Sequence, residues 1–385
     1  MTNDAIDRAA RWLQAWDGQG THRTATEGDH AGAAWLAAEA AALGASPEFE
    51  EFTVDRLDPG PCFLEIDGAR IDAIPAFDAP STDGVTGHLG AEIAVAELSP
   101  QAVYSGEYRT LRRQGGHQAL VIICTGDQPG MGLLNAEQFG EPYGAPAIHV
   151  SSEAGDTVSR ALARGATARL VSKSRRTQAS ARNVVVTLPG RDPALPPLVV
   201  MTPRSSWWQS TAERGGGIVC WLETLRALLA IPPAGPVTFA ATSGHELGHL
   251  GLDDFVARRP GCERATIWVH YGANIGAAGG TLSLMSSREE LAANAAAETR
   301  PDRIAPPTQV PSGETRDIHL AGGAYLTLVG TNKFFHLPQD RWPHSVDVPR
   351  IGAIAAGAAR FVSGLPVSGS GTPASPRAQT SGAAR

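Results

Sequence analysis

From residue 182 onward the sequence alternates between short apolar runs and amphipathic segments, and this alternation limits the folds open to the chain more than any other feature. The pattern predicts strands at 182–188, 198–201, 237–241, 265–270 and 324–329, and helices at 215–229, 252–258, 288–298 and 350–362. Strands that alternate with helices usually lie parallel, because each helix carries the chain back along one face of the sheet. The sequence therefore predicts an α/β fold, a three-layer αβα sandwich on a mostly parallel mixed sheet.

The first 178 residues have a different texture. Helical spacing is found at 4–16 and 30–43, and 49–54 alternates like a strand. From about residue 60 short strands are separated by glycine and proline, which is typical of a separate β-rich module. The predicted division has four parts. Residues 1–58 form the first part of the α/β domain, 59–178 an inserted β-rich domain and 179–365 the main part of the α/β domain. Residues 366–385 form a low-complexity tail that is expected to be disordered.

Composition limits the classes of protein to which this chain can belong. Of 385 residues, 42% are hydrophobic and 18% charged, with a net charge of −7, which suits a sizeable core and argues against a nucleic-acid partner. No apolar run approaches the ~18 residues of a membrane span, and the N-terminus lacks the layout of a signal peptide. The four cysteines are scattered without a CxxC pair, which is typical of buried reduced thiols. We expect a cytoplasmic protein without a membrane partner, and the sequence leaves homo-oligomerisation open.

One segment, His245-Glu-Leu-Gly-His249, matches the HExxH pattern of zinc proteases. On a helix its two histidines would share a face and bind zinc. However, the segment directly follows the strand at 237–241 and contains glycines that disfavour a helix. We favour a glycine-rich turn between a strand and a helix that begins near Leu252, with the match arising by chance.

Three further segments follow predicted strands, where open α/β sheets place their ligands. After 198–201 come Arg204, Trp207 and Trp208, which could clamp a substrate or form a buried aromatic corner. Glu213 precedes three glycines that allow close backbone approach, although a carboxylate there also suits a helix N-terminus. His336 lies in the loop after 324–329, and we expect it to be functional.

In this order, these segments resemble the zinc aminopeptidase family, which also includes the glutaminyl cyclases. The likeness is carried by Asn183-Val-Val-Val-Thr-Leu-Pro-Gly190 with the following strand, by Thr242–Gly251 as a Gly-Glu-Glu-x-Gly-x-x-Gly turn, and by Phe335-His-Leu-Pro-Gln-Asp340 as the late His-x-x-x-Asp loop. The segments ALVIICTGDQPG and APAIHVSSEAG resemble the protease-associated (PA) domain often inserted in this family. The resemblance covers nearly the whole chain.

The resemblance implies a divergent metal site. Of two zinc ions usual in the family, one takes a bridging carboxylate, a glutamate and a histidine, and the matching positions hold Glu213, Glu246 and His336. The His-x-Asp segment of the second zinc aligns with Pro203-Arg-Ser205, and its later aspartate falls near Asn274, so these ligands are lost. His270 is close by, but we expect it to point elsewhere. Three protein ligands complete a catalytic zinc site, so we expect one divalent metal, for which zinc suits the mixed N/O donors.

The resemblance further implies a metal-dependent hydrolase of an amide or related C–N bond in a small-molecule or peptide-like substrate. His245 stands where the family has its general base, and an imidazole can accept a proton from water at neutral pH. Arg204, Ser205, Trp207, Trp208 and Asp340 are the expected substrate-binding residues. Three alternatives stay open: His245 only hydrogen-bonds the turn, the scaffold performs cyclisation or acyl transfer, or the protein is a catalytically dead binding or scaffold protein.

Overall fold

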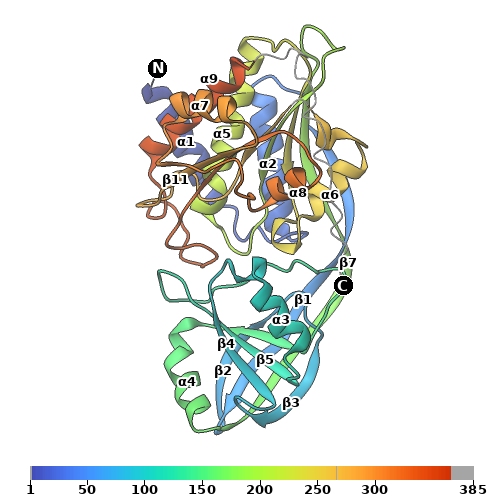
Figure 1. Cartoon of the computed structure of the whole chain (residues 1–385), viewed down its shortest axis with the longest axis vertical. Helices are drawn as coiled ribbons and strands as arrows, with labels where there is room; N and C mark the ends of the chain where they lie inside the picture. The colour runs from blue at the N-terminus through green and yellow to red at the C-terminus, as the bar shows by residue number, and fades with distance from the viewer. Residues whose placement is uncertain (1, 266, 366–385) are drawn as a thin grey trace, which may run out of the picture.

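The computed structural model describes residues 2–265 and 267–365, so the tail predicted at 366–385 lies outside the described residues. Figure 1 shows an upper lobe of strands and helices above a smaller lower lobe, with β1 and β7 running through both. None of the helices in the described part of the chain has the length and apolar character needed to cross a membrane.

The upper lobe is built on a mixed sheet with the strand order β12-β11-β13-β10-β8-β9-β7-β1. Neighbouring strands from β13 through β10 and β8 to β9 are parallel, while β11 and β7 pair antiparallel with β13 and β9. These strands are β8 (Leu198–Pro203), β9 (Val237–Thr242), β10 (Ile267–Tyr271), β11 (Leu282–Ser286), β12 (Arg303–Ile304) and β13 (Tyr325–Gly330).

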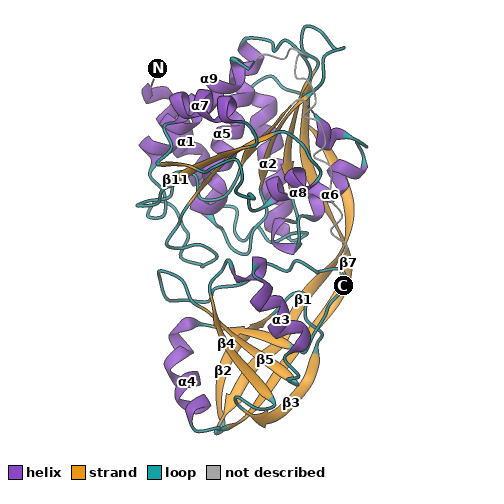
Figure 2. Ribbon diagram, viewed as in Figure 1, coloured by secondary structure: helices purple, strands orange, loops and turns teal. Residues whose placement is uncertain are grey.

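Helices cover both faces of this sheet (Figure 2). One apolar core includes Val184, Val186 and Val200 and the helices α1 (Thr2–Asp17), α2 (Glu27–Ala42), α5 (Thr211–Ala230), α7 (Glu289–Thr299) and α9 (Val348–Ser363). Val185 and Val199 point to the opposite core, which includes side chains of α6 (Leu250–Ala257) and α8 (Glu314–Leu320). Successive strand residues thus face opposite cores, as side-chain alternation requires. The predicted three-layer αβα sandwich is confirmed.

The lower lobe is built on two long antiparallel strands, β1 (Glu48–Ile66) and β7 (Thr167–Leu188). Its own apolar core includes Leu64, Val121, Ile148 and Leu170. The remaining elements are β2 (Ala69–Pro75), β3 (Thr82–His88), β4 (Ile93–Leu98), α3 (Gly106–Gln114), β5 (Ala119–Cys124), β6 (Ala147–Val150) and α4 (Gly155–Ala163). The loop between β5 and β6, residues 125–146, returns to the upper lobe and is called the covering loop below.

Candidate functional site

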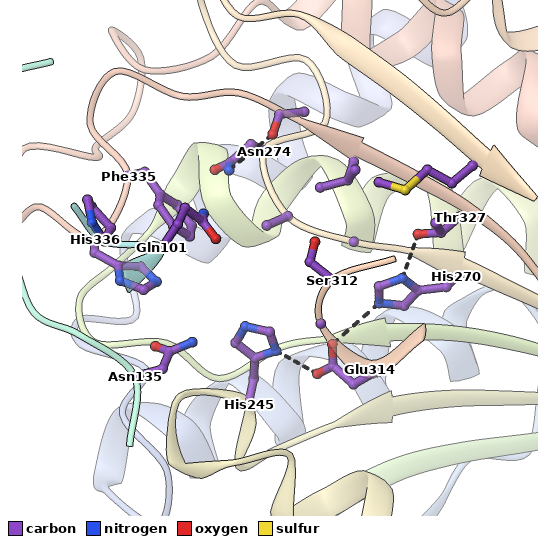
Figure 3. Close-up of a pocket in the computed structure, with 17 residues that line it drawn as sticks. Gln101, Asn135, His245, His270, Asn274, Ser312, Glu314, Thr327, Phe335 and His336 are labelled. Atoms are coloured by element: carbon purple, nitrogen blue, oxygen red, sulfur yellow. Dashed lines mark hydrogen bonds and ion pairs between the residues drawn. The ribbon is translucent and has the colours of Figure 1, made fainter. Parts of the chain in front are cut away.

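The candidate site lies where β8, β9, β10 and β13 end. The segments after β8 and β9 contribute Glu213 and His245, and the loop after β13 contributes His336. Helix α8 adds Glu314 from the side, and the covering loop adds Asn135 (Figure 3). These residues come from distant parts of the chain, and the carboxyl edge of the sheet is the place where α/β folds bring such residues together.

Glu213 and His336 face each other in the interior. Both are about 1% exposed, and His336 Nε2 lies 3.6 Å from Glu213 Oε1. Neither Glu213 oxygen nor His336 Nε2 has a hydrogen-bond partner among the described residues. His336 Nδ1 is 2.7 Å from the Leu133 carbonyl oxygen of the covering loop. A histidine held through Nδ1, with Nε2 free toward a carboxylate, is the arrangement seen in metal ligands.

Arg214 adds a permanent positive charge beside this pair. Its Nη2 lies 2.6 Å from Glu213 Oε1, and its Nε donates a 2.8 Å hydrogen bond to the Ser205 carbonyl oxygen. Burial alone would raise the pKa of the Glu213 carboxyl, but Arg214 and then His336 outweigh it, so this pKa is lowered. Glu213 is therefore ionised at neutral pH.

Glu246 is buried too, but its carboxylate is already engaged. Oε1 accepts hydrogen bonds from the Thr24 N–H and hydroxyl, at 2.6 and 2.7 Å, and Oε2 accepts one from the Ser205 hydroxyl at 2.6 Å. Burial nevertheless raises the pKa of Glu246. The structure thus brings Glu213 and His336 close together, whereas three lone-pair positions of the Glu246 carboxylate are already used. In the described part of the chain, Glu213, Glu246 and His336 do not form a group whose ligand atoms all lie within 4.8 Å of one another.

His245 forms a pair with Glu314 at the wall of the pocket. His245 Nδ1 lies 2.6 Å from Glu314 Oε1, and both side chains are buried (Figure 3). Burial and then the Arg214 charge lower the pKa of His245 to about 4, so the imidazole is neutral at pH 7. Donation from Nδ1 to the carboxylate leaves Nε2 as the basic nitrogen, which is the orientation required of a general base.

Two more histidines surround Glu314. His270 Nε2 lies 3.5 Å from Glu314 Oε2, while His270 Nδ1 contacts the hydroxyls of Thr327 and Thr315. The expectation that His270 points elsewhere is wrong, since it lines the same pocket. His249 Nδ1 contacts the Asp317 carboxylate at 2.7 Å. His245, His249 and Glu314 each offer a ligand atom within 4.8 Å of the other two, which makes them, among the described residues, a group of three able to hold a metal.

The HExxH segment adopts the predicted turn. Residues His245–Leu247 form one turn of 3-10 helix, and α6 begins at Leu250 rather than near Leu252. Gly244 and Gly248 have φ values of 86° and 88°, which favour glycine. The segment is not a zinc-binding helix, but its two histidine rings still lie 5.2 Å apart.

A pocket with about 60 Å³ of room for water lies between these groups. Its polar lining includes His245, His270, Glu314, Asn274 and His336 (Figure 3). A more open polar pocket next to it is lined by His245, His249, Asp317 and Asn135. His245 therefore faces both spaces, and water and substrate groups could reach it from either.

The residues expected to bind substrate have other partners. Arg204 is 0% exposed, ion-paired to Asp29 and hydrogen-bonded to the Arg182 carbonyl oxygen. Ser205 is also 0% exposed and accepts hydrogen bonds from the N–H groups of Gly244 and His245. Both side chains are enclosed by the protein, so the structure assigns them to support of the site instead of substrate contact.

Trp207, Trp208 and Asp340 also support the site. The Trp207 ring lies tilted against Phe77, with ring centroids 4.6 Å apart, and its Nε1 donates a hydrogen bond to Asn135 Oδ1. Trp208 donates to the His336 carbonyl oxygen. Asp340 is fully buried and accepts hydrogen bonds at 2.8 and 2.9 Å from the N–H groups of Ala212 and Glu213, which places it at the N-terminus of α5. Trp207 is buried, as in the alternative of an aromatic corner, whereas Trp208 is half-buried.

Sequence reasoning missed several residues of the site. Arg214 is adjacent to Glu213, and this charged pair in the first turn of a largely apolar helix was the signal available. Glu314 follows Ser312-Gly313, in a segment with no strong helical period, and no pattern in the sequence links it to His245. The covering loop belongs to the inserted lobe, so only the structure could place Leu133 and Asn135 at the site.

Comparison with solved structures finds the same fold in zinc aminopeptidases. A zinc aminopeptidase from Bacillus subtilis superposes with a TM-score of 0.71 at 17% identity, covering 92% of this chain and 93% of that chain. An aminopeptidase from Aneurinibacillus sp. gives a TM-score of 0.67 at 15% identity, with 94% of each chain covered. Glutaminyl cyclase from Tannerella forsythia gives 0.51 at 11% identity, covering 94% and 99%.

No protein-family model and no curated protein matches the sequence. At these identities the structural likeness establishes the fold and leaves the activity to be argued from the site. The chain therefore has the fold of the zinc aminopeptidases over nearly its whole length.

Proposed function

We propose that this protein hydrolyses an amide or related C–N bond in a small-molecule or peptide-like substrate, with one divalent metal ion at the site. The observation that carries the proposal is the buried His245–Glu314 pair, with Nδ1 and Oε1 2.6 Å apart, on the wall of a pocket that also contains His336. A neutral imidazole oriented by a carboxylate is suited to take a proton from water.

The donor atoms fit one metal ion better than two. Glu213 Oε2 and His336 Nε2 are buried polar atoms without a hydrogen-bond partner among the described residues, which a cation would satisfy, while Glu213 Oε1 already lies 2.6 Å from Arg214 Nη2. A mixed nitrogen and oxygen donor set favours zinc. Glu246, whose oxygens accept hydrogen bonds from Thr24 and Ser205, is the expected third ligand. The resemblance implies one metal ion instead of two at this position, because Pro203 and Ser205 stand where it would have ligands of the second.

The chemistry can be assigned to residues of this chain. When bound, the metal ion would polarise a carbonyl group and make a nearby water more acidic. His245 accepts the proton as water adds to the carbonyl carbon, and Glu314 stabilises the resulting imidazolium. The C–N bond then breaks, and His245 returns the proton to the leaving nitrogen. Asp340 holds the backbone at Glu213 and so keeps this carboxylate in place.

Metal analysis of the gently purified protein tests the metal. We expect about one zinc per chain in the wild type, and loss of it in Glu213→Gln and His336→Ala. His344→Ala, which changes an exposed histidine of the same loop, is the matched control. Two zinc ions per chain, or none, would contradict the proposal. Loss of zinc in His249→Ala instead would move the metal to the His245, His249 and Glu314 group.

A panel of aminoacyl and acylamino substrates tests the reaction. Turnover with oxygen from labelled water in the product supports hydrolysis, whereas product without solvent oxygen indicates cyclisation or acyl transfer. Bound metal without turnover across the panel would indicate a binding or scaffold protein. A binding or scaffold protein is therefore the second candidate function. It is favoured because both Glu246 oxygens already accept hydrogen bonds within the protein.

We also propose that the lower lobe is a PA-like domain inserted at 59–178, between 1–58 and 179–365 of the α/β domain. Its separate apolar core and its entry and exit through β1 and β7 support this.

A further inference from the structure

Arg214 is a charged residue that the proposed mechanism does not use. Its side chain is 1% exposed, and only Nε has a hydrogen bond of good geometry, to the Ser205 carbonyl oxygen. Neither Nη1 nor Nη2 has a hydrogen-bond partner among the described residues, although Nη2 is in ion-pair contact with Glu213 Oε1 at 2.6 Å. A buried guanidinium with unused donors is costly unless its charge is needed where it lies.

The charges around Arg214 show why the cation is needed. Glu213 is 1% exposed, and a buried carboxylate without a countercharge is strongly unfavourable. Arg214 Nη2 lies 2.6 Å from Glu213 Oε1, and His336 Nε2 lies 3.6 Å from the same oxygen. The guanidinium therefore compensates Glu213 directly beside a histidine of the pocket.

The position of Arg214 also matters. Its Nε donates a hydrogen bond to the Ser205 carbonyl oxygen in the segment after β8, and its Nη2 contacts the Glu213 carboxylate. The resemblance implies that this segment lacks the ligands of a second metal and that Glu213 stands where the family has a bridging carboxylate. We propose that the Arg214 guanidinium takes the place of a second metal cation beside Glu213, so that the centre accepts at most one divalent ion. Because the guanidinium is part of the chain, a chelator cannot remove this charge.

This inference concerns the site of the proposed function, but it is tested by zinc binding and needs no turnover. Zinc chloride is titrated by calorimetry into the wild type, Arg214→Ala and Arg214→Lys. Removing the guanidinium leaves Glu213 uncompensated, so Arg214→Ala should bind one more zinc per chain or bind zinc at least tenfold more tightly. Arg214→Lys keeps the charge and should behave like the wild type. Equal zinc binding by the wild type and Arg214→Ala overturns the inference.

A double variant separates compensation of Glu213 from other effects. Glu213→Gln/Arg214→Gln removes both charges, so it should fold and show no gain in zinc binding; a gain equal to that of Arg214→Ala would overturn the inference. If Arg214→Ala is unfolded without metal, refolding is repeated with zinc chloride. Recovery of the native circular dichroism spectrum with zinc, and not with magnesium, supports the inference, and failure to recover contradicts it. A wild type that binds zinc but shows no turnover would defeat the proposed function alone.

Discussion

At the scale of single residues, the proposed function depends most on His245. It occupies a turn of 3-10 helix between two glycines of positive φ, so its ring is held by backbone geometry as well as by Glu314. The strongest competing interpretation is that His245 only stabilises this turn. The two roles differ in what they predict for a variant that keeps the metal ligands intact.

We predict that His245→Ala lowers kcat by about 10²–10⁴-fold, the usual contribution of a general base, while zinc content is unchanged. Steady-state kinetics and metal analysis on the same preparation check this. Glu314→Gln keeps the shape of the partner but not its charge, so it should lower kcat less and shift the acid limb of the pH–rate profile. Unchanged turnover in His245→Ala would refute the role of base.

A second residue-scale prediction concerns acid stability. His149 is 1% exposed, its Nε2 accepts a hydrogen bond from the Leu134 N–H, and burial lowers its pKa to about 3. Unfolded histidine titrates near 6.5. Between these values the unfolded state binds the extra proton, so stability falls as the pH decreases from about 6.5, by about 1.4 kcal/mol per pH unit for this residue.

Urea unfolding between pH 7 and pH 4 checks this linkage. His149→Gln should be less stable at pH 7 but should lose stability less steeply on acidification. His22, whose pKa is also lowered to about 3, contributes equally to both proteins. His344→Gln, an exposed control, should keep the wild-type slope. An equal slope in His149→Gln and the wild type would show that His149 is not the group involved.

At the scale of elements, α5 shows how the site depends on close packing. The three glycines at 215–217 were expected to permit close backbone approach, and a Cβ on Gly216 would lie 1.9 Å from the Ile275 carbonyl oxygen. The helix begins at Thr211 because Asp340 accepts from its first N–H groups, which sequence spacing could not reveal. This start places Glu213 in the first turn, at the carboxyl edge of the sheet.

We predict that Gly216→Ala destabilises the protein by about 2 kcal/mol or more, because the clash outweighs the gain of about 1 kcal/mol in helix propensity. Gly155→Ala is the matched control. It lies in the first turn of α4, and its Cβ would meet only Ile123 Cγ2, at 3.8 Å. This control should be neutral or slightly stabilising in urea unfolding, and equal effects of the two substitutions would contradict the packing argument.

The elements show which parts of the fold sequence patterns can predict. Strands such as β8 and β9 are short, mostly apolar runs and were predicted to within two residues of their observed ends. By contrast, β1 was predicted at 49–54 with short separate strands from about residue 60; the structure has one strand with an irregularity between Pro59 and Cys62. Exposed β3 and short α8 lack a period strong enough to detect. Because α8 was not predicted, Glu314 was not recognised as a residue of the site.

At the scale of the whole molecule, the site is shared between the lobes. The resemblance could place Glu213, His245 and His336 because they lie in ordered motifs of the upper lobe. It could not show that Leu133 of the covering loop binds His336 Nδ1, or that the Ala136 N–H donates to the Glu246 carbonyl oxygen. These contacts join segments more than 100 residues apart in sequence, and no local pattern encodes them.

The covering loop therefore provides a test of whether the lobes act together. Asn135 of this loop lines the pocket and accepts a 3.0 Å hydrogen bond from Trp207 Nε1 of the upper lobe. If this bond joins the lobes, Asn135→Ala and Trp207→Phe each remove it, and their effects on unfolding should be non-additive by about 0.5–1.5 kcal/mol. Asn135→Ala with the exposed His344→Ala should be additive.

Because the bond fixes the pocket wall, both single variants should also raise KM more than they lower kcat. Additive effects and an unchanged KM would mean that the lower lobe covers the site without shaping it.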